Sequence, residues 1–156
     1  MRRRWLVLGA TVTLATGLGV GLWLGLRGGQ AEPTQQQYLA RVSSVCRSYG
    51  RRLERVAAPS DPAAYGNVIS AVEQVVPLLR AEEAAMRAVR APSALGARLD
   101  RLYALNRRSI AELEAALAAA KRRRAGGVAI GLVRFSTLRD QVHGLAVGIG
   151  IECNPH

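Results

Sequence analysis

The apolar residues of this chain form one continuous run near the start and four periodic stretches after it. Residues 5–26 include no charged side chain and are flanked by arginines at positions 2–4 and 27. At about 1.5 Å per residue, a helix of this length spans the ~30 Å hydrocarbon core of a bilayer. Trp5 and Trp23 would lie near the two interfaces. The run predicts a transmembrane helix whose basic N-terminus stays in the cytoplasm.

A cleaved secretory signal peptide is the alternative interpretation of the same run. The sequence Gly29-Gln30-Ala31 is a small-x-small site of the kind that signal peptidases cut. However, the apolar part of a signal peptide is typically about 7–15 residues long, and this run is longer and ends in Arg27. We therefore favour the uncleaved anchor. Under both interpretations the rest of the chain is exported.

The four periodic stretches predict four amphipathic helices, because apolar residues recur in each at intervals of three and four. Thr34 and Gln37 predict a capping box at the first helix, which we expect to end near residue 57. Asp61 and Pro62 predict the cap and first position of the second helix, with a kink near Pro77. The remaining two are expected over about 93–124 and from 128 to before 153, with the turn between them at residues 126–127.

Helices joined by short loops, with no competing strand pattern, indicate an all-α fold. We expect an N-terminal transmembrane helix followed by an up-down four-helix bundle closed by one disulfide. The expected organisation is a cytoplasmic stub and anchor over residues 1–27, a tether over 28–33, and an exported four-helix domain over 34–156. About 125 residues suffice for one domain with a core of its own.

Cys46 and Cys153 are the only two cysteines, and both fall in the exported part. In an oxidising compartment such a pair favours a disulfide over a metal or redox site. A straight last helix would carry Cys153 well past Cys46, so the tail must turn back. We expect residues 148–153 to run in extended form along the first helix.

The residues that could suggest catalysis lack the spacing that catalysis needs. Ser136, Asp140 and His143 are the residue types of a hydrolase triad, but they share one helix without a nucleophile elbow or a donor loop. Glu82 and Glu83 are adjacent, so on a helix they diverge by about 100° and are expected on a solvated face. We therefore expect no enzyme activity, no metal site and no cofactor.

Small residues form a stripe along one face of the predicted anchor, since they recur at every fourth position. Such stripes allow two transmembrane helices to approach closely, although glycine is also common in these helices for other reasons. A partner helix or a homodimer is therefore expected with the same weight as a purely compositional origin. The stripe consists of Gly9, Thr13, Gly17, Gly21 and Gly25.

The exported part carries a net charge of about +7, since four of the 22 basic residues and none of the 11 acidic ones precede residue 28. In an up-down bundle several basic side chains would meet at the end distal to the membrane. They form either a solvated surface or a docking surface for an anionic envelope polymer or an acidic protein; nucleic acid is disfavoured because no aromatics interleave with them. The residues are Arg52, Arg55, Lys121, Arg122, Arg123 and Arg124.

The order of these features resembles a group of small exported actinobacterial helical proteins of uncharacterised function. The resemblance depends on Cys46 midway along the first helix, the breaks at Pro59 and Pro92, and Cys153 close to the end. It implies a disulfide-clipped helical domain and no particular activity. Many proteins of this group are lipoproteins, whereas this chain has no lipobox cysteine after its apolar run.

Together these patterns predict a non-enzymatic, single-pass protein of the cell membrane. Its extracytoplasmic helical domain would bind an envelope component or a membrane complex. The alternative is an accessory to a transmembrane signalling or transport partner, contacted through the glycine face of the anchor. A ligand carrier with a pocket between helices is a further possibility that no motif specifies.

Overall fold

The protein folds into four α-helices in the part of the chain that the computed structural model describes, residues 31–56 and 64–153. The chain divides into two units, Met1–Glu32 and Pro33–His156, and these helices all belong to the second. No strand occurs in the described ranges, which confirms the predicted all-α class. The helices are α2 (Gln35–Leu53), α3 (Tyr65–Ala88), α4 (Gly96–Lys121) and α5 (Ala125–Ile149), with a short 3₁₀ helix, η1 (Ser93–Leu95), before α4.

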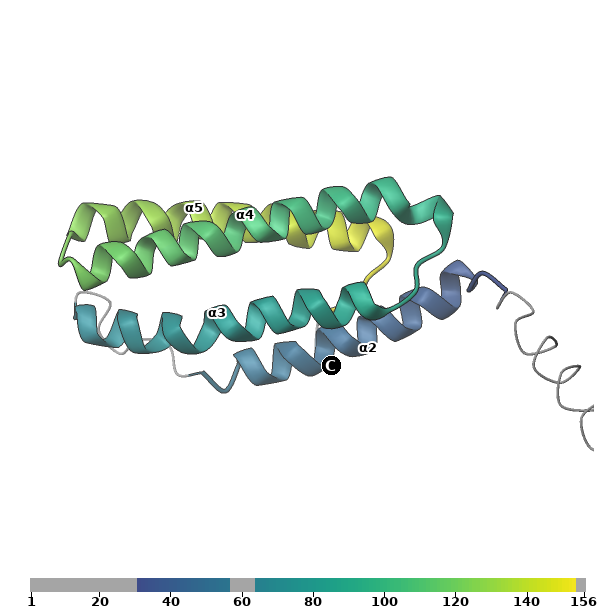
Figure 1. Ribbon diagram of the computed structural model, residues 1–156, viewed down its shortest axis with the longest axis horizontal. Helices are drawn as coiled ribbons and strands as arrows, with labels where there is room; N and C mark the ends of the chain where they lie inside the picture. The colour runs from purple at the N-terminus through teal and green to yellow at the C-terminus, as the bar shows by residue number, and fades with distance from the viewer. Residues whose placement is uncertain (1–30, 57–63, 154–156) are drawn as a thin grey trace, which may run out of the picture. The chain divides into compact units, whose positions relative to one another are not determined.

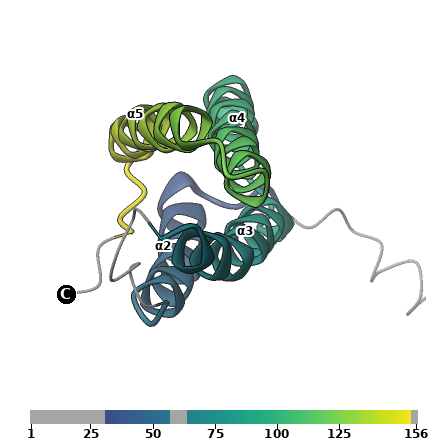
Figure 2. The ribbon, with the colours of Figure 1, turned by 90° about the vertical axis from the view of Figure 1, so that its left-hand side faces the viewer.

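Successive helices alternate in direction (Figure 1) and occupy four corners in chain order when the second unit is viewed from its end (Figure 2). The tightest packing joins α4 to α5, followed by α3 to α4 and α2 to α3. Direct helix packing between the first and last members, α2 and α5, is slight. The helical bundle is therefore built as an open series of three antiparallel pairs, and a different element closes it.

The helix starts agree only in part with the sequence prediction. The capping box of α2 is confirmed, since Gln37 N–H donates to Thr34 Oγ1 at 3.2 Å and Thr34 N–H donates to Gln37 Oε1 at 3.1 Å. Asp61 and Pro62, the predicted cap and first position of the second helix, lie outside the described residues. Helix α3 begins at Tyr65, and the carbonyl of Ala64 accepts the N–H groups of Asn67 and Val68. Pro77 lies inside α3 without ending it.

The turn between α4 and α5 is made by arginines rather than by the predicted glycines. Arg123 adopts a left-handed conformation with φ of 54°, and the N–H of Arg124 returns to the carbonyl of Ala119. Gly127 instead lies in the first turn of α5, where a Cβ would approach Ala119 Cβ to 2.8 Å. Gly127 therefore allows α4 and α5 to pack closely. The positive φ of Arg123 in the turn is unfavourable by about 1 kcal/mol, because the residue is not glycine.

The C-terminal tail turns back as predicted, but over a shorter length. Helix α5 continues through Gly148 and ends at Ile149, and Gly150 reverses the chain with φ of 97°. Ile151 is then buried in the core. Cys153 bonds to Cys46 of α2 across a Cα–Cα distance of 5.0 Å, which confirms the predicted disulfide. The tail segment 150–153 thus joins the end of α5 to the middle of α2.

The close approach of α4 and α5 gives a test with a matched control. A Cβ at Gly131 would lie 2.8 Å from Ala116 Cβ and 3.0 Å from its backbone, whereas a Cβ at Gly144 meets nothing within 4 Å. Gly144→Ala should raise the free energy of unfolding by ~0.5–1 kcal/mol through helix propensity. Gly131→Ala should lower it by about 1–3 kcal/mol through overpacking.

Urea denaturation followed by circular dichroism measures both changes on the full chain. Because the two substitutions are chemically identical and lie in the same helix, the difference between them isolates the contact with Ala116. Equal stabilisation by both variants would show that α4 and α5 do not approach as closely as described.

Candidate functional site

A layer of buried polar side chains interrupts the core between two apolar clusters. The cluster at the disulfide end includes Tyr38, Val42 and Leu99, and the other includes Val72, Leu79 and Leu113. Between them the buried polar and charged residues of α3 and α4 are Glu82, Glu83, Asn106 and Ser109. Burying such groups is costly unless they are hydrogen-bonded, so the partners of each one decide what the layer does.

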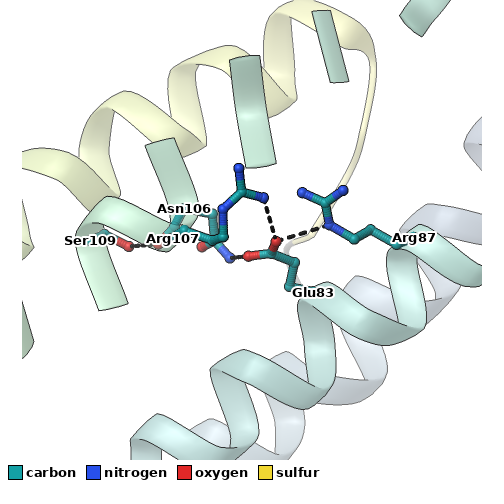
Figure 3. Close-up of polar contacts among 5 residues, drawn as sticks. All are labelled: Glu83, Arg87, Asn106, Arg107 and Ser109. Carbon is teal, nitrogen blue, oxygen red and sulfur yellow. Dashed lines mark hydrogen bonds and ion pairs between the residues drawn. The ribbon is translucent and has the colours of Figure 1, made fainter. Parts of the chain in front are cut away.

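Glu83 is fully engaged by donors from two helices (Figure 3). Its Oε1 accepts from Arg87 Nε at 2.9 Å and lies 3.3 Å from an Arg107 guanidinium nitrogen. Its Oε2 accepts from Asn106 Nδ2 at 2.9 Å. The carboxylate therefore has three donors, two of them cationic, which is the arrangement that a buried charge requires. Glu83 is a structural residue that joins α3 to α4.

Asn106 extends this network from α4 to α5. Its amide nitrogen donates to Glu83, and its amide oxygen accepts from an Arg139 guanidinium nitrogen at 2.9 Å. The Ser109 hydroxyl donates to the main-chain carbonyl of Asn106 at 2.7 Å. The Asn106 side chain thus uses both its donor and its acceptor, and it links α3, α4 and α5 at one level of the bundle.

Glu82 has the opposite environment from its neighbour. Its side chain is 7% exposed, and no nitrogen donor reaches it among the described residues. The one close polar contact is between its Oε1 and Sγ of Cys46, at 3.3 Å. A disulfide sulfur carries no proton, so a hydrogen bond across this contact requires the protonated form of Glu82. Burial raises the pKa of Glu82, while the charge of Arg139 acts in the opposite direction.

A cleft of about 310 Å³ lies beside Glu82, bordered by all four helices and by the disulfide. Its wall is mainly apolar, and Glu54 and His143 are exposed side chains at its rim. The polar groups in the wall are Glu82, Glu83, Asn106 and Arg139. The apolar contributors include Leu53, Met86, Leu102, Tyr103, Val142 and Ala146. The cleft therefore combines an apolar body with a small number of polar groups, as ligand sites usually do.

The tail fixes the side of the cleft where α2 faces α5. The Ser43 hydroxyl accepts the N–H of Glu152 at 2.9 Å, and the disulfide is formed one residue later. The Cys153 carbonyl oxygen is 3.6 Å from the position that a Cβ on Gly50 would occupy. Because the tail is bonded to α2 through both backbone and side chain, it holds α2 at a defined distance from α5 and keeps the cleft open.

The prediction that Glu82 and Glu83 lie on a solvated face is wrong. Both side chains are buried because α3 lies between α2 and α4, so its buried surface is wider than one apolar stripe. The spacing of apolar residues along α3 also indicated that residue 82 or 83 occupies a core position. Val76, Leu79 and Met86 belong to one stripe, and the interval of seven between the last two leaves a core position that Glu82 or Glu83 must fill.

The triad-like residues of α5 do not converge. Ser136, Asp140 and His143 all have exposed side chains, and no hydrogen bond among the described residues joins any two of them. His143 contributes to the rim of the cleft. Within the described ranges, no group of His, Cys, Asp and Glu side chains is arranged to hold a metal ion.

The basic residues proposed as an anionic-partner surface are all exposed, but some already have contacts. Lys121 pairs with Glu73 at 2.7 Å, and the Arg52 guanidinium lies over the Tyr49 ring at 4.8 Å. Arg55 Nε donates to the main-chain carbonyl of Arg51. The described salt bridges do not involve Arg122, Arg123 or Arg124. Of the six residues only Lys121 takes part in a described salt bridge, so the charges of Arg52, Arg55 and the three arginines of the α4–α5 turn have no described acidic partner.

The predicted anchor and its stripe, Gly9, Thr13, Gly17, Gly21 and Gly25, lie outside the described residues. Among the helices that are described, none has both the length and the apolar character needed to cross a membrane. Comparison with known protein families, with curated protein sequences and with solved structures finds no match to this chain. The site must therefore be interpreted from its own geometry.

The raised pKa of Glu82 predicts a pH dependence of stability. An acid whose pKa is higher in the folded state than its ordinary value of 4.5 stabilises the fold below that value. The contribution is lost as the pH rises through the folded-state pKa. Glu82→Gln should therefore become more stable relative to the wild type as the pH increases from acidic to mildly alkaline.

Thermal unfolding at a series of pH values measures this difference. Glu54→Gln is the matched control, since it removes an exposed carboxyl from the rim of the same cleft. A stability difference between Glu82→Gln and the wild type that stays constant across the series would contradict the assignment.

Proposed function

We propose that this chain is a non-enzymatic, single-pass envelope protein whose extracytoplasmic domain binds a small amphipathic molecule in the cleft beside Glu82. The observation that carries the proposal is the cleft itself. It places a buried carboxyl that lacks a nitrogen donor in a wall that is otherwise largely apolar. Soluble ligands are held in such sites by burial of their apolar part and oriented by a few polar groups.

The size of the cleft is consistent with a small ligand. Its volume of about 310 Å³ is at the lower end of the ~300–1,000 Å³ typical of ligand pockets. The site is also preformed, because the Glu83–Asn106–Arg139 network and the disulfide fix the helices around it. Preorganisation lowers the entropic cost of binding.

The non-enzymatic part of the proposal is supported by how the reactive groups in the wall are used. Cys46 and Cys153 are joined to each other, and Glu83 is held by three donors. Glu54, Glu82 and His143 remain, and no described hydrogen bond links any of them to a hydroxyl nucleophile. The arrangement is suited to holding a ligand and lacks the coupled nucleophile and base of acyl transfer.

The envelope location is supported by the disulfide and by the uncharged run at residues 5–26, since structural disulfides persist outside the reducing cytoplasm. In this proposal the N-terminus is cytoplasmic and residues 28–156 are exported. The alternative is an accessory role, in which a transmembrane partner or a second copy is held against the glycine face of the anchor. The proposed contact for an anionic envelope polymer or acidic protein is the exposed basic surface formed by Arg52, Arg55, Lys121, Arg122, Arg123 and Arg124.

Filling the cleft should abolish binding of a neutral amphipathic probe. Hexan-1-ol is such a probe, and the Met86 methyl group reports binding, because Met86 lines the cleft and the only other methionine is Met1. In NMR spectra of the full chain with labelled methionine methyl groups, hexan-1-ol should shift the Met86 signal. Val142→Trp, which places a large ring in the cleft wall, should weaken this binding at least tenfold.

Val147→Trp is the matched control, because Val147 lies on the same helix and is 58% exposed. It should leave the titration unchanged. Gly50→Leu gives an independent obstruction, since Gly50 borders the cleft and has room for a Cβ at 3.6 Å from the nearest atom. A Met86 signal that does not respond to hexan-1-ol in the wild type, or that responds equally in Val142→Trp, would refute the proposed site.

A further inference from the structure

We infer that the cleft selects ligands that carry a protonated amine on an apolar body, with the ammonium group bound by Glu82. This inference rests on the proposed function and specifies the chemistry of its ligand. The amine would supply the donor that Glu82 lacks, and the apolar body would pack along the wall formed by Met86, Leu102 and Val142.

Glu82 and Glu83 are neighbouring buried carboxyl groups that differ in their hydrogen-bond donors. Both are buried on α3, with exposed fractions of 7% and 9%. Glu83 has three nitrogen donors, whereas Glu82 has none among the described residues, and its one described polar contact is with a disulfide sulfur. A buried carboxyl without a donor is costly when ionised. An incoming ammonium group offers up to three N–H donors and a compensating charge, so Glu82 can release its proton to water and bind as a carboxylate.

The position of Arg139 argues against an anionic ligand. Its guanidinium group is on the cleft wall, but one nitrogen already donates to Asn106 at 2.9 Å, and the side chain is partly exposed to water. A ligand carboxylate beside Arg139 would also face Glu82, so the two acids would have to share a proton or repel each other. The group that gains most from a ligand is therefore Glu82, and the ligand charge that suits it is positive.

The apolar wall of the cleft favours an apolar body on the ligand. Met86 and Leu102 are buried core residues that also border the cleft, and Met86 is an unbranched side chain that adapts to different shapes. The wall presents few groups that would direct a polar body. A hydrocarbon or ring attached to the amine is thus the expected partner of this surface.

Three six-carbon probes that differ only in the end group test the inference: hexylamine, hexan-1-ol and hexanoate. Each is titrated into the full chain at neutral pH and followed by the Met86 methyl signal. Hexylamine should bind at least about tenfold more tightly than hexan-1-ol, as expected for a charge-assisted hydrogen bond. Hexanoate should bind more weakly than hexan-1-ol. In Glu82→Gln the ratio between the affinities for hexylamine and hexan-1-ol should fall to about one.

Glu114→Gln is the control for the variant, since Glu114 is partly exposed and pairs with Arg80 away from the cleft. It should keep the preference for the amine. Equal affinities for hexylamine and hexan-1-ol would overturn the inference and leave the proposed binding site intact. Tightest binding of hexanoate would overturn it in favour of Arg139 as the selecting group. Failure of all three probes to shift Met86 would refute both the inference and the proposed function.

Discussion

The bond between Cys46 and Cys153 is the constraint on which the rest of this domain depends. The four helices pack as an open series, α2 on α3, α3 on α4 and α4 on α5, with little direct packing between the first and the last. The tail closes the series by tying the end of α5 to α2 (Figure 2). In the chain-entropy account, closing a loop of 107 residues stabilises the fold by about 4–5 kcal/mol. That is comparable with the whole stability of many small domains.

The same bond determines what the space between α2 and α5 contains. A bundle that closed by helix packing would fill this region with side chains. Here the short tail spans it, and a cleft remains beneath the disulfide. The buried polar layer follows from the same geometry: Glu83 and Asn106 lie where α3, α4 and α5 meet and satisfy each other, while Glu82 faces the cleft without a donor. A satisfied network specifies a unique arrangement of helices, whereas Glu82 has no nitrogen donor among the described residues and its one described polar contact is with Cys46 Sγ.

Much of the fold could be predicted from the sequence because the periodicity of apolar residues is strong. The all-α class, the capping box at Thr34, the disulfide and the return of the tail toward the first helix are confirmed, although the tail turns only at Gly150. These features depend on local patterns or on the small number of cysteines. The turn at Arg123 was missed because glycine pairs usually mark turns, whereas Gly127 serves close contact with α4, and such contact is a property of two helices at once.

The candidate site was missed for a related reason. The charge of Glu82 and Glu83 predicts exposure, and only the interval of seven between Leu79 and Met86 showed that one of them must occupy the core. The partners that distinguish the two, Cys46 for Glu82 and Asn106 for Glu83, are separated from them by 36 and 23 residues in sequence. Local pattern could therefore locate a buried carboxyl, but it could not show which of the two lacked a donor.

The most direct test of this account is the distance between α2 and α5 with and without the disulfide. Spin labels attached through ketone-bearing residues at Arg51 and Asp140, both exposed and next to cleft residues, leave the native cysteines unmodified. Double electron–electron resonance on the full chain should give one narrow distance distribution in the oxidised protein. In the variant with both Cys46→Ser and Cys153→Ser the distribution should broaden and shift to longer distances. A distribution that is unchanged by loss of the disulfide would contradict the claim that this bond closes the bundle and maintains the cleft.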